Sequence, residues 1–232
     1  MVRSYVSIDL ETTGLNPKYD GITEIGAVKV VEGIPGDTFS AFVNPGKKLE
    51  PRIVELTGIR DEDLESAPYI EEVLPELFAF LGELPLLGHQ VMFDYSFLKK
   101  AAVNKGISFE KQGLDTLKIA RKYLTDLEHR SLDYLCGYYH IPHRAHRALE
   151  DAEATHFLYE KLAEQFYSEE ESLFQPKQLC FRVKKDRPAS KSQKEKLYRL
   201  ARQHKISLRE DVERLTRSEA SRIVDKIRSK AY

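Results

Sequence analysis

The chain has 232 residues, a formal net charge of −1 and 41% hydrophobic residues, which is enough apolar content for one globular core with a small appendage. No apolar run approaches the ~20 residues of a membrane span, so we expect no membrane partner. Cys136 and Cys180 have neither metal-ligand spacing nor a disulfide pattern, and the first residues do not read as a signal peptide. Both observations favour a cytoplasmic protein.

The charge is unevenly distributed along the chain. From Lys177 onward there are 18 Lys and Arg against 7 Asp and Glu, so this segment carries +11 while residues 1–176 carry −12. A basic appendage of this kind often meets a polyanion such as nucleic acid. It could equally serve solubility or fold back onto the acidic part, and charge alone leaves these readings open.

Apolar periodicity predicts strands first and then an alternation of strands and helices. In chain order the predicted elements are strands at 4–10, 22–31 and 37–45, helices at 51–59 and 70–81, a strand at 84–89, and helices at 93–106, about 115–124, 131–139 and about 147–167. Gly33, Pro35 and Gly36 mark a turn between the second and third strands. This order indicates a three-layer α/β domain around a mixed sheet.

The remaining residues predict a second, smaller unit. An acidic, proline-containing stretch and a candidate short strand at 179–184 form a linker over residues 169–190. A helix begins at Lys191, and Ser218 and Glu219 read as the start of a final helix. We therefore predict a catalytic domain over 1–168 and a small basic helical module over 191–232.

Four carboxylates occupy core-facing ends of predicted elements. Asp9 and Glu11 end the first strand, and Asp94 shares a helical stripe with apolar residues. Asp151 is favoured over its neighbour Glu150, because the helical stripe through Asp151 is mostly apolar and the stripe through Glu150 is mostly charged. Each acid alone would also fit an ordinary turn, cap or helix-dipole role.

Together, such acids form a negative cluster that stays ionised only if cations compensate it. Oxygen ligands without cysteine point to Mg²⁺ or Mn²⁺. Enzymes that catalyse nucleophilic displacement at a phosphate commonly use two metal ions about 3.5–4 Å apart. The sequence therefore predicts a site for two divalent metal ions.

Three short motifs contain these acids: DLETTG (9–14), HQVMFD (89–94) and HRALEDA (146–152). In order and spacing they resemble the three motifs of the DnaQ-like DEDDh 3′→5′ exonucleases, and LTGI (56–59) resembles the stretch between the first two. That family includes the proofreading epsilon subunit and the PolC-type exonuclease domain of bacterial DNA polymerase III. The resemblance covers roughly residues 4–167 and implies an RNase H-like mixed five-stranded sheet flanked by helices.

The resemblance also implies a role for each motif residue. Asp9 would bridge both ions, Glu11 and Asp151 would hold the ion that activates water, and Asp94 would hold the second ion. His146, five residues before Asp151, would be the general base, because the pKa of imidazole lies near working pH.

Among the seven histidines, we favour His146 as the base because of its place in the motif. His143 lies three residues too early, and we expect its replacement by alanine to be mild. The other histidines considered are expected to be surface or structurally satisfied residues: His129, His140, His156 and His204.

Residues near the first two motifs are predicted to contact substrate. The implied substrate-binding set is Thr12, Thr13, Gly14, Leu15, His89 and Phe93. Leu15 resembles the apolar residue that packs against the last bases. A simple β-turn at Thr12, Thr13 and Gly14 is compatible with this role. Gln90 departs from the asparagine of many relatives.

The preferred function is a metal-dependent exonuclease that releases nucleoside 5′-monophosphates from single-stranded or frayed DNA 3′ ends. A DNA polymerase subunit is a candidate partner. An exoribonuclease is the alternative within the same class. A non-catalytic nucleic-acid-binding or polymerase-binding module is the alternative of another class.

Overall fold

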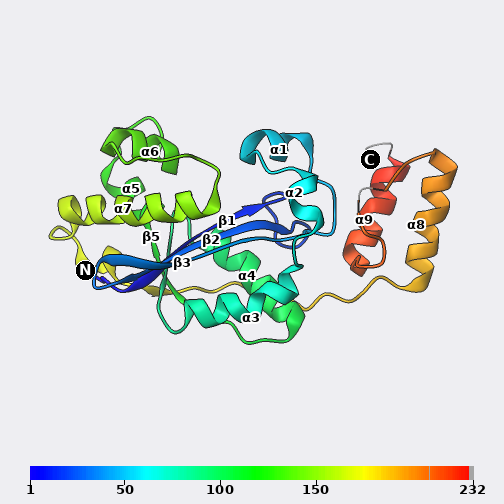
Figure 1. The fold of residues 1–232 in the computed structure, drawn as a ribbon, viewed down its shortest axis with the longest axis horizontal. Coiled ribbons are helices and arrows are strands. Elements are labelled where there is room, and N and C mark those ends of the chain that lie inside the picture. Colours follow the sequence, from blue (N-terminus) through cyan, green and yellow to red (C-terminus); the bar gives the residue numbers. More distant parts are fainter. Residues whose placement is uncertain (209, 230–232) are drawn as a thin grey trace.

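The computed structural model describes residues 1–208 and 210–229, and its centre is a mixed sheet with the strand order β3-β2-β1-β4-β5-β6 (Figure 1). Strands β1, β2 and β3 form an antiparallel meander, and β4 and β5 continue the sheet in parallel with β1. The strands are β1 (Tyr5–Thr12), β2 (Ile22–Val31), β3 (Ile34–Phe42), β4 (Leu86–Gly88), β5 (Gln112–Asp115) and β6 (Lys177–Gln178).

Helices cover both faces of this sheet. The helices are α1 (Pro51–Thr57), α2 (Asp61–Glu65), α3 (Ile70–Leu81), α4 (Met92–Lys105), α5 (Thr116–Tyr123), α6 (Leu132–Tyr139), α7 (Ala148–Phe166), the 3₁₀ helix η1 (Glu171–Phe174), α8 (Lys191–His204) and α9 (Arg217–Arg228). One apolar core lies between the sheet and α3 and α4, and a second lies between the sheet and α5, α6 and α7. The predicted three-layer α/β domain is confirmed.

Three details of the sheet differ from the prediction. Strand β5 was missed, because four residues are too few to show a period. The sheet has six strands rather than five, because the strand expected at 179–184 lies at β6 instead and pairs with β5. The β2–β3 turn is also shorter than expected: Glu32 and Gly33 have positive φ values of 51° and 80°, and β3 begins at Ile34.

The alternation of side chains between the two faces of β1 explains how α7 is placed. Tyr5, Ser7, Asp9 and Glu11 share one face of the strand. The Ser7 hydroxyl donates to the Ala152 carbonyl of α7 (2.6 Å), and the Tyr5 hydroxyl lies 2.8 Å from His156 Nδ1. The same strand face thus packs against α7 at one end and presents two acids at the other.

Gly26 lets the first turn of α7 approach the sheet closely. It lies opposite Asp9 in the β1–β2 pairing. A Cβ built on it would lie 2.1 Å from both Ala148 C and Leu149 N, a separation that real atoms do not reach. The absence of a side chain here therefore fixes the distance between the start of α7 and the carboxyl end of β1.

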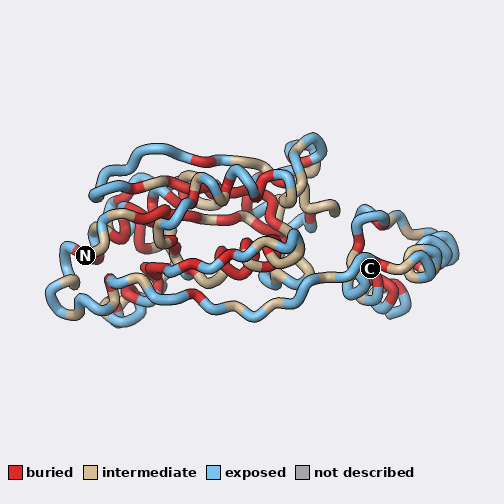
Figure 2. The backbone as a smooth tube through the Cα atoms, turned by 90° about the horizontal axis from the view of Figure 1, so that it is seen from below, coloured by how far each residue is buried: buried red, intermediate tan, exposed pale blue. Residues whose placement is uncertain are grey.

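The C-terminal helices form a module with its own apolar core. Leu197, Ala220 and Ile223 are among its buried residues, and Figure 2 shows the module as a separate buried centre at one end of the molecule. Arg214 connects it to the main domain, since its guanidinium lies 3.4 Å from the centre of the Tyr69 ring and 3.1 Å from Glu71 Oε2. The predicted helical module is confirmed.

The segment between the two units is partly built into the main domain. Phe174 of η1 is fully buried in the core under α7, and Leu179 is buried on the opposite side of the sheet. An extended stretch then runs to the module. Within the described residues, no helix is both long enough and apolar enough to span a membrane.

Candidate active site

The four predicted acids converge at the carboxyl end of β1. Asp9 and Glu11 project from the strand beside Asp151 of α7, and one ligand oxygen from each of these three residues lies within 4.8 Å of the others. Asp94, in the first turn of α4, is 3% exposed and accepts a hydrogen bond from the Leu10 N–H (3.1 Å). The chain thus brings residues 9, 11, 94 and 151 to one place.

Burial and mutual repulsion oppose ionisation of this cluster. Burial raises the pKa of Asp9 well above its usual range, and the charges of Asp94, Asp151 and Glu11 raise it further. Burial likewise raises the pKa of Glu11 to about 8, with Asp151 and Glu24 adding to the effect. Burial also raises the pKa of Asp94.

The cluster fits divalent cations because bound positive charge would offset each of these unfavourable effects. Its donors are all carboxylate oxygens, and Mg²⁺ and Mn²⁺ prefer such oxygen ligands over softer sulfur ligands. The acidic cluster predicted from the sequence is present, while the identity and number of the metal ions remain predictions.

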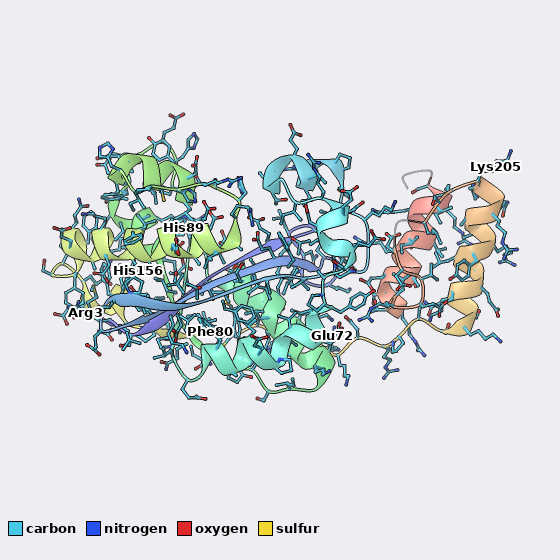
Figure 3. The ribbon with its side chains drawn as sticks, in the orientation of Figure 1. Arg3, Glu72, Phe80, His89, His156 and Lys205 are labelled. Atoms are coloured by element: carbon cyan, nitrogen blue, oxygen red, sulfur yellow. The ribbon has the colours of Figure 1, made fainter. Side chains whose placement is uncertain are left out.

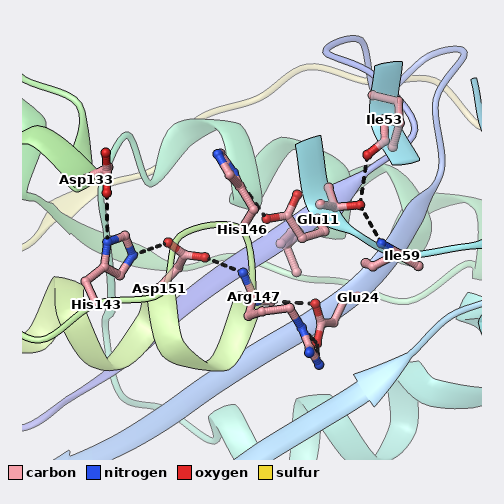
Figure 4. Close-up of polar contacts among 12 residues, drawn as sticks. Glu11, Glu24, Ile53, Ile59, Asp133, His143, His146, Arg147 and Asp151 are labelled. Carbon is pink, nitrogen blue, oxygen red and sulfur yellow. Dashed lines mark hydrogen bonds and ion pairs between the residues drawn. The ribbon is translucent and has the colours of Figure 1, made fainter. Parts of the chain in front are cut away.

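A fifth acid, Glu24, holds the start of α7 next to this cluster. It is 2% exposed and lies directly opposite Glu11 in the β1–β2 pairing. Its carboxylate accepts hydrogen bonds from Arg147 Nη2 (3.1 Å) and from the Ala148 N–H (3.3 Å) (Figure 4). An acid at a helix N-terminus is favourable for the helix dipole. Sequence reasoning missed Glu24, although a single acid on an otherwise apolar strand face was the available signal.

Two histidines flank the acids in different ways. The His146 side chain is 45% exposed, and its Nδ1 lies 3.9 Å from Glu11 Oε1. His146 also has a φ of 67°, a backbone conformation that is costly for a residue with a side chain. The His143 side chain is only 3% exposed, and its Nε2 lies 2.7 Å from Asp151 Oδ1. This contact of His143 with Asp151 was not predicted from the sequence, and the expectation that His143→Ala is mild stays a prediction.

The loop after β1 presents the first group of expected substrate residues. The Thr13 N–H donates to the Gly21 carbonyl (2.9 Å), and the Thr12 hydroxyl donates to the Gly14 carbonyl (2.7 Å). A side chain at Gly14 would collide with the Asp20 carboxylate. Leu15 is 85% exposed, which is unusual for leucine. The loop is thus held by its own hydrogen bonds while one apolar side chain projects into solvent.

His89 and Phe93, the second group of expected substrate residues, are half-buried. His89 Nε2 lies 2.7 Å from the Arg130 carbonyl, which can only accept, so this nitrogen carries a hydrogen. Its Nδ1 lies 2.9 Å from the Thr116 hydroxyl, and burial lowers the pKa of the ring. Figure 3 shows His89 between the sheet and the segment around α6. Phe93 packs against Phe97 at a ring separation of 5.0 Å. Their predicted contact with substrate stays a prediction.

The chain belongs to a family of hydrolases that act on phosphodiester bonds, the exonuclease family: the family model described as Exonuclease (RNase_T) matches residues 6–159. The DnaQ-like resemblance is thereby confirmed.

Curated relatives include "DNA polymerase III PolC-type" of Caldanaerobacter subterraneus subsp. tengcongensis, which is 41% identical over 162 residues. This match covers 69% of the chain and 12% of the relative. The PolC-type protein of Clostridium perfringens is 39% identical over 152 residues, which cover 65% of the chain and 10% of that relative. The chain therefore spans about a tenth of the length of these relatives.

Solved structures with a similar fold are also exonucleases. Exonuclease X in complex with 5′ overhanging duplex DNA gives a TM-score of 0.56 at 24% identity, covering 70% of this chain and 92% of that one. Exonuclease I gives a TM-score of 0.62 at 19% identity, covering 75% of this chain and 42% of that one. These similarities confirm the RNase H-like fold.

Proposed function

We propose that the protein is a metal-dependent 3′→5′ exonuclease that removes nucleoside 5′-monophosphates from DNA 3′ ends. The observation that carries this proposal is the approach of Asp9, Glu11 and Asp151 within 4.8 Å at the end of β1. In an exonuclease fold, four converging acids beside a polyanionic substrate serve a purpose only when cations join them.

Asp9, Glu11, Asp94 and Asp151 would hold two divalent cations, Mg²⁺ or Mn²⁺. When bound, such ions polarise a phosphodiester and lower the pKa of water. His146 is suited to accept the proton of the attacking water, because its side chain is half-exposed and lies next to Glu11. His146 directly precedes Arg147, the N-cap residue of α7, so the helix that carries Asp151 also places this histidine.

The loop of Thr12, Thr13, Gly14 and Leu15 would receive the terminal nucleotide. The exposed Leu15 side chain offers an apolar surface to a base, and stacking of this kind does not depend on sequence. His89 and Phe93 would complete the pocket wall. A single-stranded or frayed end fits best, because paired ends would first have to be opened.

An oligonucleotide assay tests this function. DNA and RNA of one sequence, labelled at the 5′ or the 3′ end, would be incubated with the protein in Mg²⁺, Mn²⁺ or EDTA. We expect a ladder from the 5′-labelled DNA, a mononucleotide from the 3′-labelled DNA, and no product in EDTA or with Asp9→Asn. Full activity of Glu153→Gln, an exposed acid of α7, is the matched control.

The assay also decides between the candidates. Faster degradation of RNA would assign the exoribonuclease alternative, and product formation in EDTA would refute the metal mechanism. Binding without hydrolysis in any metal would assign the non-catalytic alternative. A polymerase partner and a cytoplasmic location remain predictions.

A further inference from the structure

His143 makes a contact with the acidic cluster that the family motif does not include. Its Nε2 lies 2.7 Å from Asp151 Oδ1 and, because a carboxylate oxygen accepts, the nitrogen is the donor. The ring lies on the connection between α6 and α7 and is almost fully enclosed, with 3% of the side chain exposed. This is a buried charge-assisted hydrogen bond, which is stronger than a neutral one.

The second oxygen of Asp151 is also engaged. The Arg147 N–H donates to Asp151 Oδ2 at 2.8 Å. His143 and Arg147, both on the segment that leads into α7, therefore contact the two oxygens of this carboxylate (Figure 4). Such a carboxylate cannot rotate freely, so its ligand oxygen stays within 4.8 Å of those of Asp9 and Glu11.

The other ring nitrogen makes no comparable contact. His143 Nδ1 lies 3.5 Å from Asp133 Oδ1 of α6 and has no hydrogen-bond partner in the described part of the chain. The ring thus lies between a carboxylate of α6 and a carboxylate of α7. Because the Asp133 side chain is 76% exposed, its charge is partly screened by solvent. The direct contact with Asp151 is therefore the one that matters for the site.

The enclosure of His143 also separates its role from that of His146. A general base must meet the attacking water, and 45% of the His146 side chain is accessible. His143 directs its proton-bearing nitrogen at Asp151 and has almost no solvent contact. Its position suits the orientation of a metal ligand and does not suit proton transfer.

We propose that His143 is a positioning residue that orients Asp151 for metal binding. The proposal rests on the metal site of the proposed function. Hydrogen-bond partners that orient metal ligands typically contribute 10–100-fold to metal affinity. Loss of the His143 donor should therefore weaken metal binding by about this factor and leave the rate at saturating metal largely intact.

Two full-length variants that both fill the space of the ring test this proposal. His143→Gln retains a side-chain N–H donor, and His143→Leu removes it. Mn²⁺ dissociation constants would be measured by electron paramagnetic resonance of free Mn²⁺, and kcat would be measured as a function of metal concentration. His129→Ala, at a histidine whose side chain is 64% exposed, controls for loss of an imidazole.

We expect His143→Leu to raise the Mn²⁺ dissociation constant about 10–100-fold, and His143→Gln to restore most of the affinity. The leucine variant should approach the wild-type kcat at high Mn²⁺, which a general disturbance of folding would not allow. Equal Mn²⁺ affinity of the two variants would overturn the proposal. So would a large loss of kcat at saturating Mn²⁺ in both, which would assign His143 to proton transfer.

The same measurements keep the two proposals apart. If the wild type does not bind Mn²⁺, the metal site of the proposed function fails. If the wild type binds Mn²⁺ and the leucine variant binds it equally well, only the role of His143 fails. Urea unfolding in EDTA shows whether each variant is folded. If the leucine variant is unfolded, His143→Ala replaces it. Water can enter the space left by the ring in this variant, but it does not supply a fixed hydrogen-bond donor.

Discussion

The raised pKa of Glu11 predicts that its replacement by glutamine stabilises the metal-free protein while it removes activity. Burial and the charges of Asp151 and Glu24 raise this pKa from 4.5 to about 8, although Arg147 acts in the opposite direction. That difference corresponds to about 5 kcal/mol between the protonated and ionised forms. Glutamine has the shape of the protonated form and cannot ionise.

The sign of the pH dependence follows from the same shift. Between pH 4.5 and about 8 the folded state binds more protons at Glu11 than the unfolded state does. The free energy of unfolding therefore falls as pH rises through this window. Stability from the protonated group is complete below pH 4.5 and is lost once pH exceeds about 8. Asp9 and Asp94 have pKa values shifted in the same direction and steepen the decline.

Urea unfolding in EDTA at pH 5 and pH 9 measures this effect. With a urea m-value of about 2 kcal/mol per molar, a 5 kcal/mol effect would move the midpoint by about 2.5 M. This is an upper limit because the cluster can relax. We expect Glu11→Gln to unfold at higher urea than the wild type at pH 9 and near the wild type at pH 5. Glu153→Gln should follow the wild type at both.

Metal should narrow the difference in stability between Glu11→Gln and the wild type. A cation that binds only the folded wild type at 100 times its dissociation constant adds about 2.7 kcal/mol, and Glu11→Gln should gain less. Parallel pH profiles of Glu11→Gln and the wild type in EDTA would refute the argument, because they would mean that Glu11 is not held in an unfavourable ionised state.

Other predictions concern the start of α7, the base and the module. Gly26→Ala should displace α7 and lower kcat by at least about 10²-fold. Gly137→Ala is the control, because a Cβ added there meets no atom of the described residues within 4 Å. Equal kcat values of the two variants would refute the argument from close approach of α7 to the sheet. His146→Ala should lower kcat by about 10²–10⁴ with little change in Mn²⁺ affinity, and unchanged kcat would exclude it as the base. Replacement of three exposed basic residues of α8 by glutamine should reduce the slope of log affinity against log salt concentration for single-stranded DNA by about 2. An unchanged slope would mean that this face does not contact phosphate. These cations are Lys191, Arg199 and Arg202.

Local sequence patterns identified much of this site. The apolar stripe that favoured Asp151 over Glu150 selected the residue that is buried in the structure, and Asp94 is buried as its own stripe indicated. Both inferences work because helical periodicity fixes the face on which a side chain lies. The first strand and the long final helix of the domain were also predicted close to their observed bounds.

Features that depend on register or on loop geometry escaped prediction. Glu24 acquires its place only because β1 and β2 pair with Glu11 opposite it, and a slip of one residue would turn it to the other face. His143 reaches Asp151 through an irregular connection whose course no periodic pattern describes. The outward direction of the module cations, such as Lys205 at the end of α8 (Figure 3), likewise depends on how the module docks.

The distribution of protein cations separates the scaffold from the reactive centre. Glu24 receives the Arg147 guanidinium and a helix N–H, so its charge is compensated inside the protein and it can fix the start of α7. Among the residues that the structure describes, no lysine or arginine forms an ion pair with Asp9, Glu11 or Asp151. An arginine placed there would lower the pKa values of these acids and stabilise the fold, but it would also occupy the position of the metal ions. The raised pKa values at the end of β1 are therefore what the proposed metal site predicts, because such a site takes its cations from solution.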